Sequence, residues 1–358
     1  MEFGMFHEFK RNPGQSEADA FTESFAVVDA AERWGLDVMW LAELHVAPER
    51  SVASAPLAIA AAIAARTQRM KLGIAVQVLP LCHPLRVAEE VSTVDHISHG
   101  RLIFGVGRSG FPRTYEAYGV SYAESRERFA EVLEIVQRAF TQERFSYQGN
   151  FYAFKDVCLV PKPYQKPYPE IRVAATSADT FPANGTQGFP IFCAVRFGTL
   201  GELGPNLRAY RAAWRAAGHP GEGKAYLRVP VYIAATEKAA RDEPEASIVA
   251  FYKYLGARIE ESATLDGARP EEQRAERGAR LQNITYDEVL RDKIIVGTPA
   301  QVAERLATLR AELGLDGILA EMNCGSLIPY EKMMESLRLL CQDVIPRVRG
   351  AGGAAAAS

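Results

Sequence analysis

The sequence predicts an α/β protein whose chain forms a single (β/α)₈ TIM barrel. Short runs rich in β-branched and aromatic residues alternate with amphipathic helical segments, which is typical of βα units that build a parallel sheet. Eight such strand-like runs are present, and eight is the number of strands that closes this barrel. The 358 residues, 48% of them apolar, provide enough material for a large core.

The expected strands are short, and they span residues 2–6, 38–42, 71–78, 102–106, 171–175, 190–195, 227–235 and 317–321. The helices between them have recognisable ends. In the segment 17–34, Phe21, Phe25 and Val28 share one face, and Gly35 ends the helix. Further helices are expected at 56–65, 85–97, 124–140 and 330–345, and Thr298-Pro299-Ala300-Gln301 predicts a capping box that begins another.

Two stretches exceed the minimal repeat, one after the fourth expected strand and one after the seventh. Residues 141–170 hold two alternating runs around Gly149-Asn150 and then a proline-rich connection, which predicts a hairpin and an extended loop. Residues 236–295 include the highly charged run 266–280. A segment of this length at a barrel rim indicates a mobile lid, although a solvated surface helix without a role is an equally open interpretation.

The barrel domain is expected to span residues 1–350, followed by a disordered tail at 351–358 that is rich in glycine and alanine. The 41 basic and 44 acidic residues give a net charge of −3, so no electrostatic footprint for nucleic acid is present. No apolar run of about 18 residues and no signal peptide are recognised. Five scattered cysteines without zinc spacing indicate reduced thiols in the cytoplasm and no metal site.

The active site of such a barrel lies at the carboxyl ends of its strands, so the residues that follow each strand are the candidates for chemistry. After the second strand, Glu43 and His45 have alternate spacing and project to the same side, where the imidazole is placed to act as a general base or donor. A polar pair that only fixes the loop is the alternative. We predict a catalytic role because titratable pairs with perturbed pKa values collect at catalytic rims.

Three elements suited to bind an anion follow neighbouring strands. Arg108 lies in a glycine-rich turn after the fourth strand, and Arg126 lies in the first turn of the next helix. After the fifth strand, residues 176–180 resemble a helix N-terminus, whose free N–H groups and hydroxyls bind anions. Taken alone, Arg108 is equally explained by a surface salt bridge and Ser177 by a plain helix cap. Together, the three predict an anion site.

In this order and spacing, a set of short motifs resembles the bacterial luciferase-like monooxygenases, and the luciferase α-subunit type in particular, over nearly the whole chain. Each motif is weak alone, and the specificity comes from their combination. The motifs are Phe3-Gly4-Met5-Phe6, Val38 through His45, Val78 through Arg86, Gly100 through Gly110, Glu124-Ser125-Arg126, Ala175 through Ala178, Gly188-Phe189-Pro190 and Val296-Gly297-Thr298-Pro299.

The resemblance implies an FMN cofactor and assigns residues to it. Arg108, Arg126, Ser177 and Thr180 match positions that bind the FMN phosphate. The Ala75–Val76 bond matches a non-proline cis peptide bond beneath the flavin ring. The residues expected to bind the cofactor are Phe6, Ala75, Val76, Arg108, Gly110, Arg126, Thr176, Ser177 and Thr180, with Phe6 and Gly110 lining the isoalloxazine ring.

The resemblance also implies the chemistry, which is the use of reduced FMN (FMNH2) and dioxygen to oxidise a small organic substrate. The implied reaction is hydroxylation or Baeyer–Villiger-type oxygen insertion through a flavin hydroperoxide, in secondary metabolism. No dinucleotide-binding unit is recognised, so a separate flavin reductase is expected to supply the reduced FMN. The family pairs subunits through the helices expected here at 56–65 and 85–97, which predicts a homodimer.

This chain departs from the family pattern at three positions. Leu44 stands where luciferases have a histidine, which predicts no light emission. Gly107 replaces a cysteine and Val195 replaces a tryptophan near the flavin, and these two changes predict a roomier or differently shaped pocket. Two other functions stay open. One is a deazaflavin-dependent oxidoreductase of the same superfamily, which transfers hydride without oxygen, and the other is a non-catalytic flavin-binding partner subunit.

Overall fold

The computed structural model describes residues 1–12, 14–195, 198–265 and 273–354. Within these residues, eight parallel strands form a closed cylinder, which confirms the predicted (β/α)₈ barrel. The pairing of β9 with β10 closes it, since Ala225 lies opposite Ile191 and Leu227 lies opposite Cys193. In the order of their pairing the strands are β1 (Glu2–His7), β2 (Val38–Leu41), β3 (Lys71–Ile74), β5 (Leu102–Gly107), β8 (Ile171–Ala174), β9 (Ile191–Ala194), β10 (Ala225–Ile233) and β12 (Gly317–Glu321).

The third expected strand, 71–78, is the one whose prediction differs most from the structure. It is divided into β3 and the short β4 (Gln77–Val78), which flank the Ala75–Val76 peptide bond. That bond is cis, as the family resemblance implied. β3 pairs with both β2 and β5, whereas β4 pairs with β5 further along, where Gln77 lies opposite Val106.

The interior of the barrel is filled by side chains that alternate with those facing the helices. Phe6, Trp40 and Phe192 belong to this inner cluster, and the Trp40 and Phe192 rings meet edge to face with centroids 5.0 Å apart. Trp40 fits because two neighbouring strands carry glycine. A Cβ at Gly4 would lie 2.3 Å from the indole nitrogen, and one at Gly73 would lie 2.0 Å from the ring. The inner packing therefore depends on these small residues.

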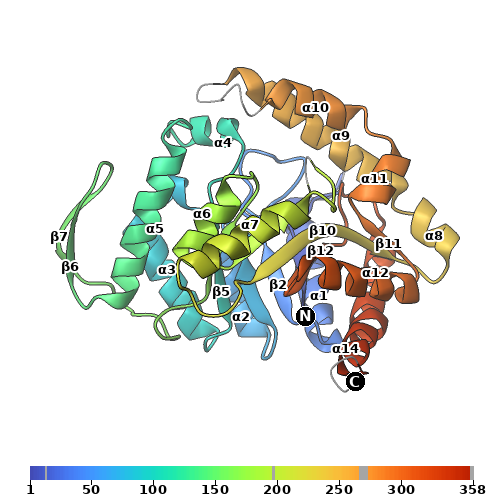
Figure 1. Ribbon diagram of the computed structural model, residues 1–358, viewed down its shortest axis with the longest axis horizontal. Coiled ribbons are helices and arrows are strands. Elements are labelled where there is room, and N and C mark those ends of the chain that lie inside the picture. The colour runs from blue at the N-terminus through green and yellow to red at the C-terminus, as the bar shows by residue number, and fades with distance from the viewer. Residues whose placement is uncertain (13, 196–197, 266–272, 355–358) are drawn as a thin grey trace.

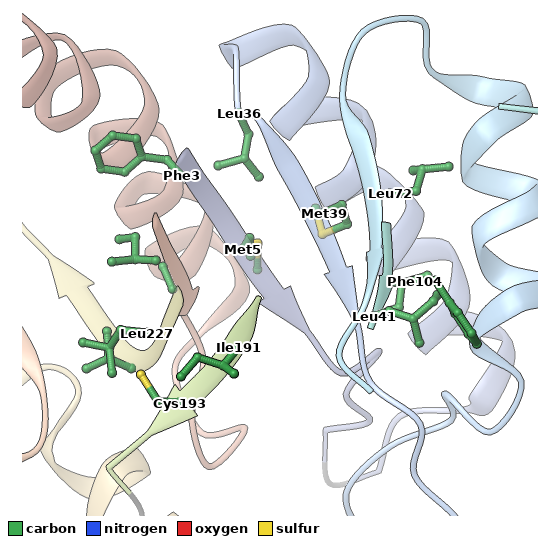
Figure 2. Close-up of a cluster of buried hydrophobic side chains, with 14 of the residues drawn as sticks. Phe3, Met5, Leu36, Met39, Leu41, Leu72, Phe104, Ile191, Cys193 and Leu227 are labelled. Carbon is green, nitrogen blue, oxygen red and sulfur yellow. The ribbon is translucent and has the colours of Figure 1, made fainter. Parts of the chain in front are cut away.

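A second and larger core lies between the barrel and its helices. Figure 2 shows Phe3 and Met5 of β1 and Met39 and Leu41 of β2 with their side chains in this layer. These positions alternate with the residues that point into the barrel, as the two-residue period of a strand requires. Because parallel strands are buried on both faces, they read in the sequence as continuous apolar runs, and this is why their positions were predictable.

Five of the helices that follow the strands match predicted segments closely. The Ser16 side chain accepts from Asp19 N at the start of α1, and Gly35, with φ of 91°, ends it. The capping box of α12 is confirmed, with Gln301 Oε1 accepting from Thr298 N at 3.0 Å. The five are α1 (Glu17–Trp34), α2 (Pro56–Arg66), α3 (Pro84–Ile97), α5 (Ser125–Thr141) and α12 (Pro299–Leu313). The short helix expected after the fifth strand is α6 (Thr180–Gln187), and the sequence did not predict α4 (Pro112–Ala117) or α7 (Leu203–Ala216).

The hairpin expected within residues 141–170 is present as β6 (Phe145–Gln148) paired antiparallel with β7 (Ala153–Val157). In Figure 1 it extends beyond α5 at the edge of the molecule. Its turn is tied to α5 by the Glu131 carboxylate, which accepts from the backbone N of Asn150, Phe151 and Tyr152 at 2.8–3.2 Å. The hairpin is thus an attachment to the barrel wall.

The insertion at 236–295 forms helices and one short strand. Figure 1 shows α9 and α10 side by side at the end of the molecule away from the N-terminus. Their backbones approach closely, since a Cβ at Gly278 would lie 2.7 Å from Gly256 O. Of the charged run 266–280, residues 266–272 lie outside the described part. The elements are α8 (Glu237–Asp242), α9 (Glu245–Glu261), α10 (Arg274–Gln282), α11 (Tyr286–Asp292) and β11 (Ile295–Gly297).

A separate apolar core holds this insertion together. Phe251 and Leu255 of α9 pack there with Leu281 of α10 and Val289 of α11. The insertion is therefore a helical cover with its own core at the carboxyl ends of the strands. Whether it moves as a lid stays a prediction.

The last predicted helix, 330–345, is longer than expected. It consists of α13 (Tyr330–Leu339), a π-helical turn (Leu340–Val344) and α14 (Ile345–Ala354). The expected tail at 351–358 therefore begins inside a helix, and residues 355–358 lie outside the described part. No helix among the described residues is both long and apolar enough to cross a membrane.

Candidate functional site

Two adjoining cavities lie at the carboxyl ends of the barrel strands. The large cavity, of about 490 Å³, reaches from the barrel interior to the first turn of α6 and is covered by α9 and α10. The small cavity, of about 280 Å³, lies between the loop after β2, the turn after β5 and α9. Leu44, Arg50 and Phe111 line both, so the two cavities are contiguous.

Every residue that the sequence predicted to bind the cofactor lines the large cavity. These residues come from β1, the cis peptide after β3, the turn after β5, α5 and the loop before α6, so closure of the barrel brings them together. Their roles as cofactor ligands stay predictions. They are Phe6, Ala75, Val76, Arg108, Gly110, Arg126, Thr176, Ser177 and Thr180.

The turn after β5 is shaped by glycine. A Cβ at Gly107 would lie 2.5 Å from Val76 Cγ2, so the missing side chain is what allows Val76 to sit against the strand. The expected roomier or differently shaped pocket stays a prediction at this position, where Val76 occupies the space beside Gly107. Val195 is buried in the core between barrel and helices and lines neither cavity.

Arg108 is held from two sides at the wall of the large cavity. Its Nη1 donates to Ser125 Oγ at 3.0 Å, and the Tyr115 hydroxyl donates to its backbone oxygen. Its guanidinium carbon lies 5.2 Å from the centre of the Tyr122 ring. Since the guanidinium has five donors and one is used here, further donors are left for an anionic ligand.

Arg126 and the loop before α6 lie together, as predicted. Arg126 Nη1 donates to Asp179 Oδ2 at 3.0 Å. Hydrogen bonding from Ser177, followed by the contact with Arg126, lowers the pKa of Asp179. Thr180 Oγ1 accepts from the backbone N of Thr176 and Ser177 at 3.2 Å each. We call Arg108, Arg126, Ser177 and Thr180 the anion wall; in this structure part of its donor capacity is satisfied by Asp179.

The predicted pair, Glu43 and His45, is confirmed to be in contact. His45 Nε2 lies 2.7 Å from Glu43 Oε1, and Glu43 Oε2 accepts from Val78 N at 2.7 Å. On the other side of the ring, His45 Nδ1 lies 2.9 Å from the Tyr118 hydroxyl. Burial and the charge of Glu43 raise the pKa of Tyr118, which keeps its hydroxyl protonated. Glu43, His45 and Tyr118 therefore form a hydrogen-bonded chain in which Glu43 and His45 line the small cavity, whereas Tyr118 is 48% exposed and lines neither cavity.

Sequence reasoning missed Tyr118, because it lies after the short α4 and no motif marks it. It also missed a charged cluster, which we define as Glu8, Lys10, Arg50, Arg228 and Glu321. One signal was present in the sequence, since Arg228 is a cation inside the otherwise apolar run of β10. The same reasoning missed Arg274, which lines the large cavity from α10 and donates to Gly110 O at 3.0 Å. Among the described residues, no group of three or more His, Cys, Asp or Glu side chains is arranged to hold a metal ion.

The sequence model of the family described as luciferase-like monooxygenase matches residues 1–317. Limonene 1,2-monooxygenase of Rhodococcus erythropolis is 25% identical over 98% of this chain and 87% of that protein. The oxygenase component of the flavin-dependent trigonelline monooxygenase of Acinetobacter baylyi is 24% identical over 97% of this chain and 95% of that protein. An uncharacterized Sinorhizobium fredii protein, y4wF, is 30% identical over 54% of this chain and 56% of that protein.

Solved structures share the fold over almost the whole chain. Monooxygenase RslO1 from Streptomyces bottropensis matches with a TM-score of 0.77 and 26% identity, covering 97% of this chain and 99% of that chain. The oxygenating constituent of 3,6-diketocamphane monooxygenase from Pseudomonas putida, solved with FMN, has a TM-score of 0.81 at 21% identity, covering 97% and 98%. An F420-dependent secondary alcohol dehydrogenase has a TM-score of 0.74 at 15% identity, covering 97% and 99%.

Proposed function

Because the chain belongs to the luciferase-like monooxygenase family and is an enzyme of it, we propose that it uses reduced FMN and dioxygen to oxidise a small organic substrate. One observation carries this proposal. Residues from five separate segments, chosen from the sequence as flavin ligands, line a single cavity at the carboxyl ends of the strands. That is the end where barrels of this class place their active sites.

The large cavity fits FMN in size and in chemistry. Its volume of about 490 Å³ lies within the range of roughly 300–1,000 Å³ that small-molecule and cofactor sites occupy. The anion wall offers two guanidinium groups and the Ser177 hydroxyl, which are suited to a phosphate, whereas the Thr180 hydroxyl donates to Ser177 O at 2.6 Å. Apolar side chains such as Phe6 and Val76 line the same cavity and are suited to a flat aromatic ring.

When bound, reduced FMN supplies the electrons with which dioxygen is activated. In the proposal, the residues of this chain bind, orient and shield. Arg108 and Arg126 hold the phosphate, and the Ala75–Val76 peptide supports the ring. Leu255 and Ile259 of α9 line the large cavity from above, so they help to exclude water from it.

The chain Glu43–His45–Tyr118 is proposed to move a proton at the small cavity. A carboxylate only accepts hydrogen bonds, so Glu43 holds the proton of a neutral His45 on Nε2. Nδ1 is then the acceptor that faces the Tyr118 hydroxyl. This arrangement lets the imidazole, at the wall of the small cavity, take a proton from Tyr118 on its outer side or return one. Leu44, between the pair, lines both cavities and gives the substrate an apolar contact.

A flavin reductase is the proposed partner. Support comes from the related Acinetobacter baylyi protein, whose name describes it as the oxygenase component of a flavin-dependent monooxygenase. Hydroxylation or Baeyer–Villiger-type oxygen insertion is the proposed outcome, and a homodimer formed through α2 and α3 is the proposed assembly. The alanine-rich face of α2 supports the last point, because small side chains let helices approach closely.

The proposal is tested by mixing the protein with one equivalent of reduced FMN in aerated buffer and following the absorbance of oxidised FMN. We expect the bound flavin to reoxidise with kinetics distinct from those of free reduced FMN, and His45→Ala to change these kinetics while FMN still binds. Reoxidation identical to that of free flavin, together with tight binding of the deazaflavin F420, would instead favour the hydride-transferring alternative. Kinetics unaffected by His45→Ala would favour a non-catalytic partner subunit.

A further inference from the structure

The charged cluster occupies the wall of the large cavity where it meets the small one. Glu8, Arg50 and Arg228 line the large cavity, and Arg50 also lines the small one. The cluster is assembled from distant parts of the chain, namely the segment after β1, the loop after β2, the middle of β10 and the end of β12. It belongs neither to the anion wall nor to the His45 chain.

The two arginines are joined through one carboxylate. Arg50 Nη2 and Arg228 Nη2 both donate to Glu8 Oε1, the second at 3.4 Å. Arg228 also donates through Nε and Nη2 to Glu321 Oε2, at 3.1 and 2.9 Å. Lys10 Nζ lies 3.6 Å from Glu8 Oε2. The guanidinium of Arg228 is stacked on the Phe6 ring, 3.5 Å from its centre, so its plane is fixed.

The cluster carries more positive than negative charge. Three cations, Lys10, Arg50 and Arg228, face two carboxylates, Glu8 and Glu321, which leaves one positive charge in excess. Among the described residues, the next carboxylates on the cavity walls, Glu43 and Glu49, form no ion pair with the arginines of the cluster. Glu43 accepts from Val78 N and contacts His45, and Glu49 accepts from Tyr254 at 3.0 Å.

This excess charge is well shielded from bulk water. The side chains of Glu8 and Glu321 are 1% and 4% exposed, and those of Arg50 and Arg228 are 11% and 12% exposed. Burial alone would raise the pKa of Glu8, but the adjacent cations hold it well below its usual range, so both the carboxylate and its partners stay charged. A buried charge without a counter-ion is costly, and such a site favours a ligand that brings the opposite charge.

Both guanidinium groups have donors that face the cavity. Within the described residues, neither Arg50 nor Arg228 has a hydrogen-bond acceptor for its Nη1. Neither nitrogen is fully buried, and both arginines line the large cavity. Two guanidinium groups that share one carboxylate oxygen and have free N–H groups form a fork suited to an oxyanion.

We propose that Arg50 and Arg228 bind an anionic oxygen group of the substrate, and that the substrate is an organic anion with an apolar body. The apolar body follows from the residues shared by the two cavities, since Leu44, Val78 and Phe111 stand beside Arg50 there. A carboxylate, an enolate and a phenolate share this chemistry. The inference rests on the proposed function, because it assigns a substrate class to the same site.

The test compares benzoate with its neutral counterpart benzamide, using FMN-loaded protein and calorimetric titration. We expect benzoate to bind at least about tenfold more tightly, and this preference to disappear in Arg50→Gln and in Arg228→Gln. Arg113→Gln is the matched control, since Arg113 lines the small cavity outside the cluster, and we expect this variant to keep the preference of the parent. Equal affinities for benzoate and benzamide in the parent protein would overturn the proposal.

The charge excess can be tested without a ligand. Arg50→Gln leaves two cations against two carboxylates and keeps the Arg228–Glu321 contact, so we expect this variant to melt near the parent, whereas Arg228→Gln breaks that buried contact and is expected to melt lower. Glu321→Gln raises the excess to two positive charges and is expected to melt at a clearly lower temperature. The reverse order of melting temperatures would contradict the charge argument. Should Arg228→Gln fail to fold, Arg228→Lys keeps the charge without the fork and is expected to retain only part of the benzoate preference.

Two further outcomes separate this inference from the proposed function. If benzoate binds the cofactor-free protein but is displaced by FMN in direct competition, the arginine pair serves the flavin, and the substrate assignment is wrong. If FMN does not bind at all, the proposed function fails. The benzoate preference of the cofactor-free protein then still decides whether the arginine pair binds anions.

Discussion

The large cavity has two charged regions that use the same residue types in opposite surroundings. At the anion wall, Arg126 and Asp179 are 43% and 60% exposed, and their contact is a single hydrogen bond. In the charged cluster, the Glu8 carboxylate is 1% exposed and forms ion pairs with three cations. Exposed pairs contribute roughly 0–1 kcal/mol, whereas breaking a buried pair costs about 3–5 kcal/mol. The anion wall is therefore free to exchange partners with a ligand, and the cluster is a fixed part of the cavity.

The largest expected effect is on stability, and it comes from removing a carboxylate of the charged cluster. Removing a carboxylate at the anion wall is the comparison. Glu8→Gln leaves Lys10, Arg50 and Arg228 facing Glu321 alone, and we expect it to lower the free energy of unfolding by about 3–5 kcal/mol. Asp179→Asn, as the matched exposed change, is expected to lower it by less than about 1 kcal/mol. Urea denaturation of both variants measures the difference. Equal losses would mean that burial does not separate the two regions.

The next effect concerns pH and the residue beside Glu8. Burial, followed by the charge of Lys10, lowers the pKa of His7 to about 4. His7 therefore becomes protonated near pH 6.5 in the unfolded chain, but only near pH 4 in the folded chain. The contribution of His7 to the free energy of unfolding is fully present above pH 6.5. It falls by about 3 kcal/mol as the pH drops toward 4.

His7→Gln removes this contribution, so the decline in stability between about pH 6.5 and pH 4 should become shallower. The control is His83→Gln, which changes an exposed histidine. Urea denaturation at several pH values gives the comparison. A variant whose pH dependence matches that of the parent would show that His7 titrates normally in the folded protein.

The third effect tests the anion wall through the cofactor. Arg108→Ala removes a guanidinium with donors left for a ligand, so we expect FMN binding to weaken by about 1.5–3 kcal/mol. Riboflavin, which has no phosphate, should bind this variant and the parent alike. Fluorescence titration with both flavins measures the effect. Parallel losses for FMN and riboflavin would place Arg108 away from the phosphate.

The smallest effect distinguishes the two arginines of the wall. Arg126→Ala is expected to weaken FMN binding by only about 1 kcal/mol, because Arg126 is exposed and already held by Asp179. Asp179→Asn removes this competition and should leave FMN binding equal to or tighter than that of the parent. Weaker FMN binding by Asp179→Asn would show that Asp179 instead positions Arg126 for the phosphate.

The same contrast explains what was predictable from the sequence. The barrel strands, the ends of α1 and the capping box of α12 depend on local patterns, and their positions follow from apolar runs, glycines and caps. The anion wall was found because its residues follow consecutive strands, and the barrel places all such residues at one rim. Glu43 and His45 were found for the same reason, within a single loop.

The features that the sequence did not reveal depend on distance along the chain. Glu8 and Arg228 are separated by 220 positions, and no periodicity links them. Tyr118 meets His45 across 73 positions. Gly107 predicted a roomier or differently shaped pocket, but the position of its neighbour Val76, which occupies the space beside it, could not be predicted. These contacts depend on packing between residues that are far apart in the chain, which local sequence patterns do not predict.

The most direct test of the central claim is the ratio of the dissociation constants of riboflavin and FMN for the unaltered protein. If Arg108 and Arg126 hold the phosphate in the large cavity, two charge-assisted contacts should make FMN bind roughly 100-fold or more tightly than riboflavin. Equal affinities for the two flavins would contradict the account, because the anion wall would then face no phosphate.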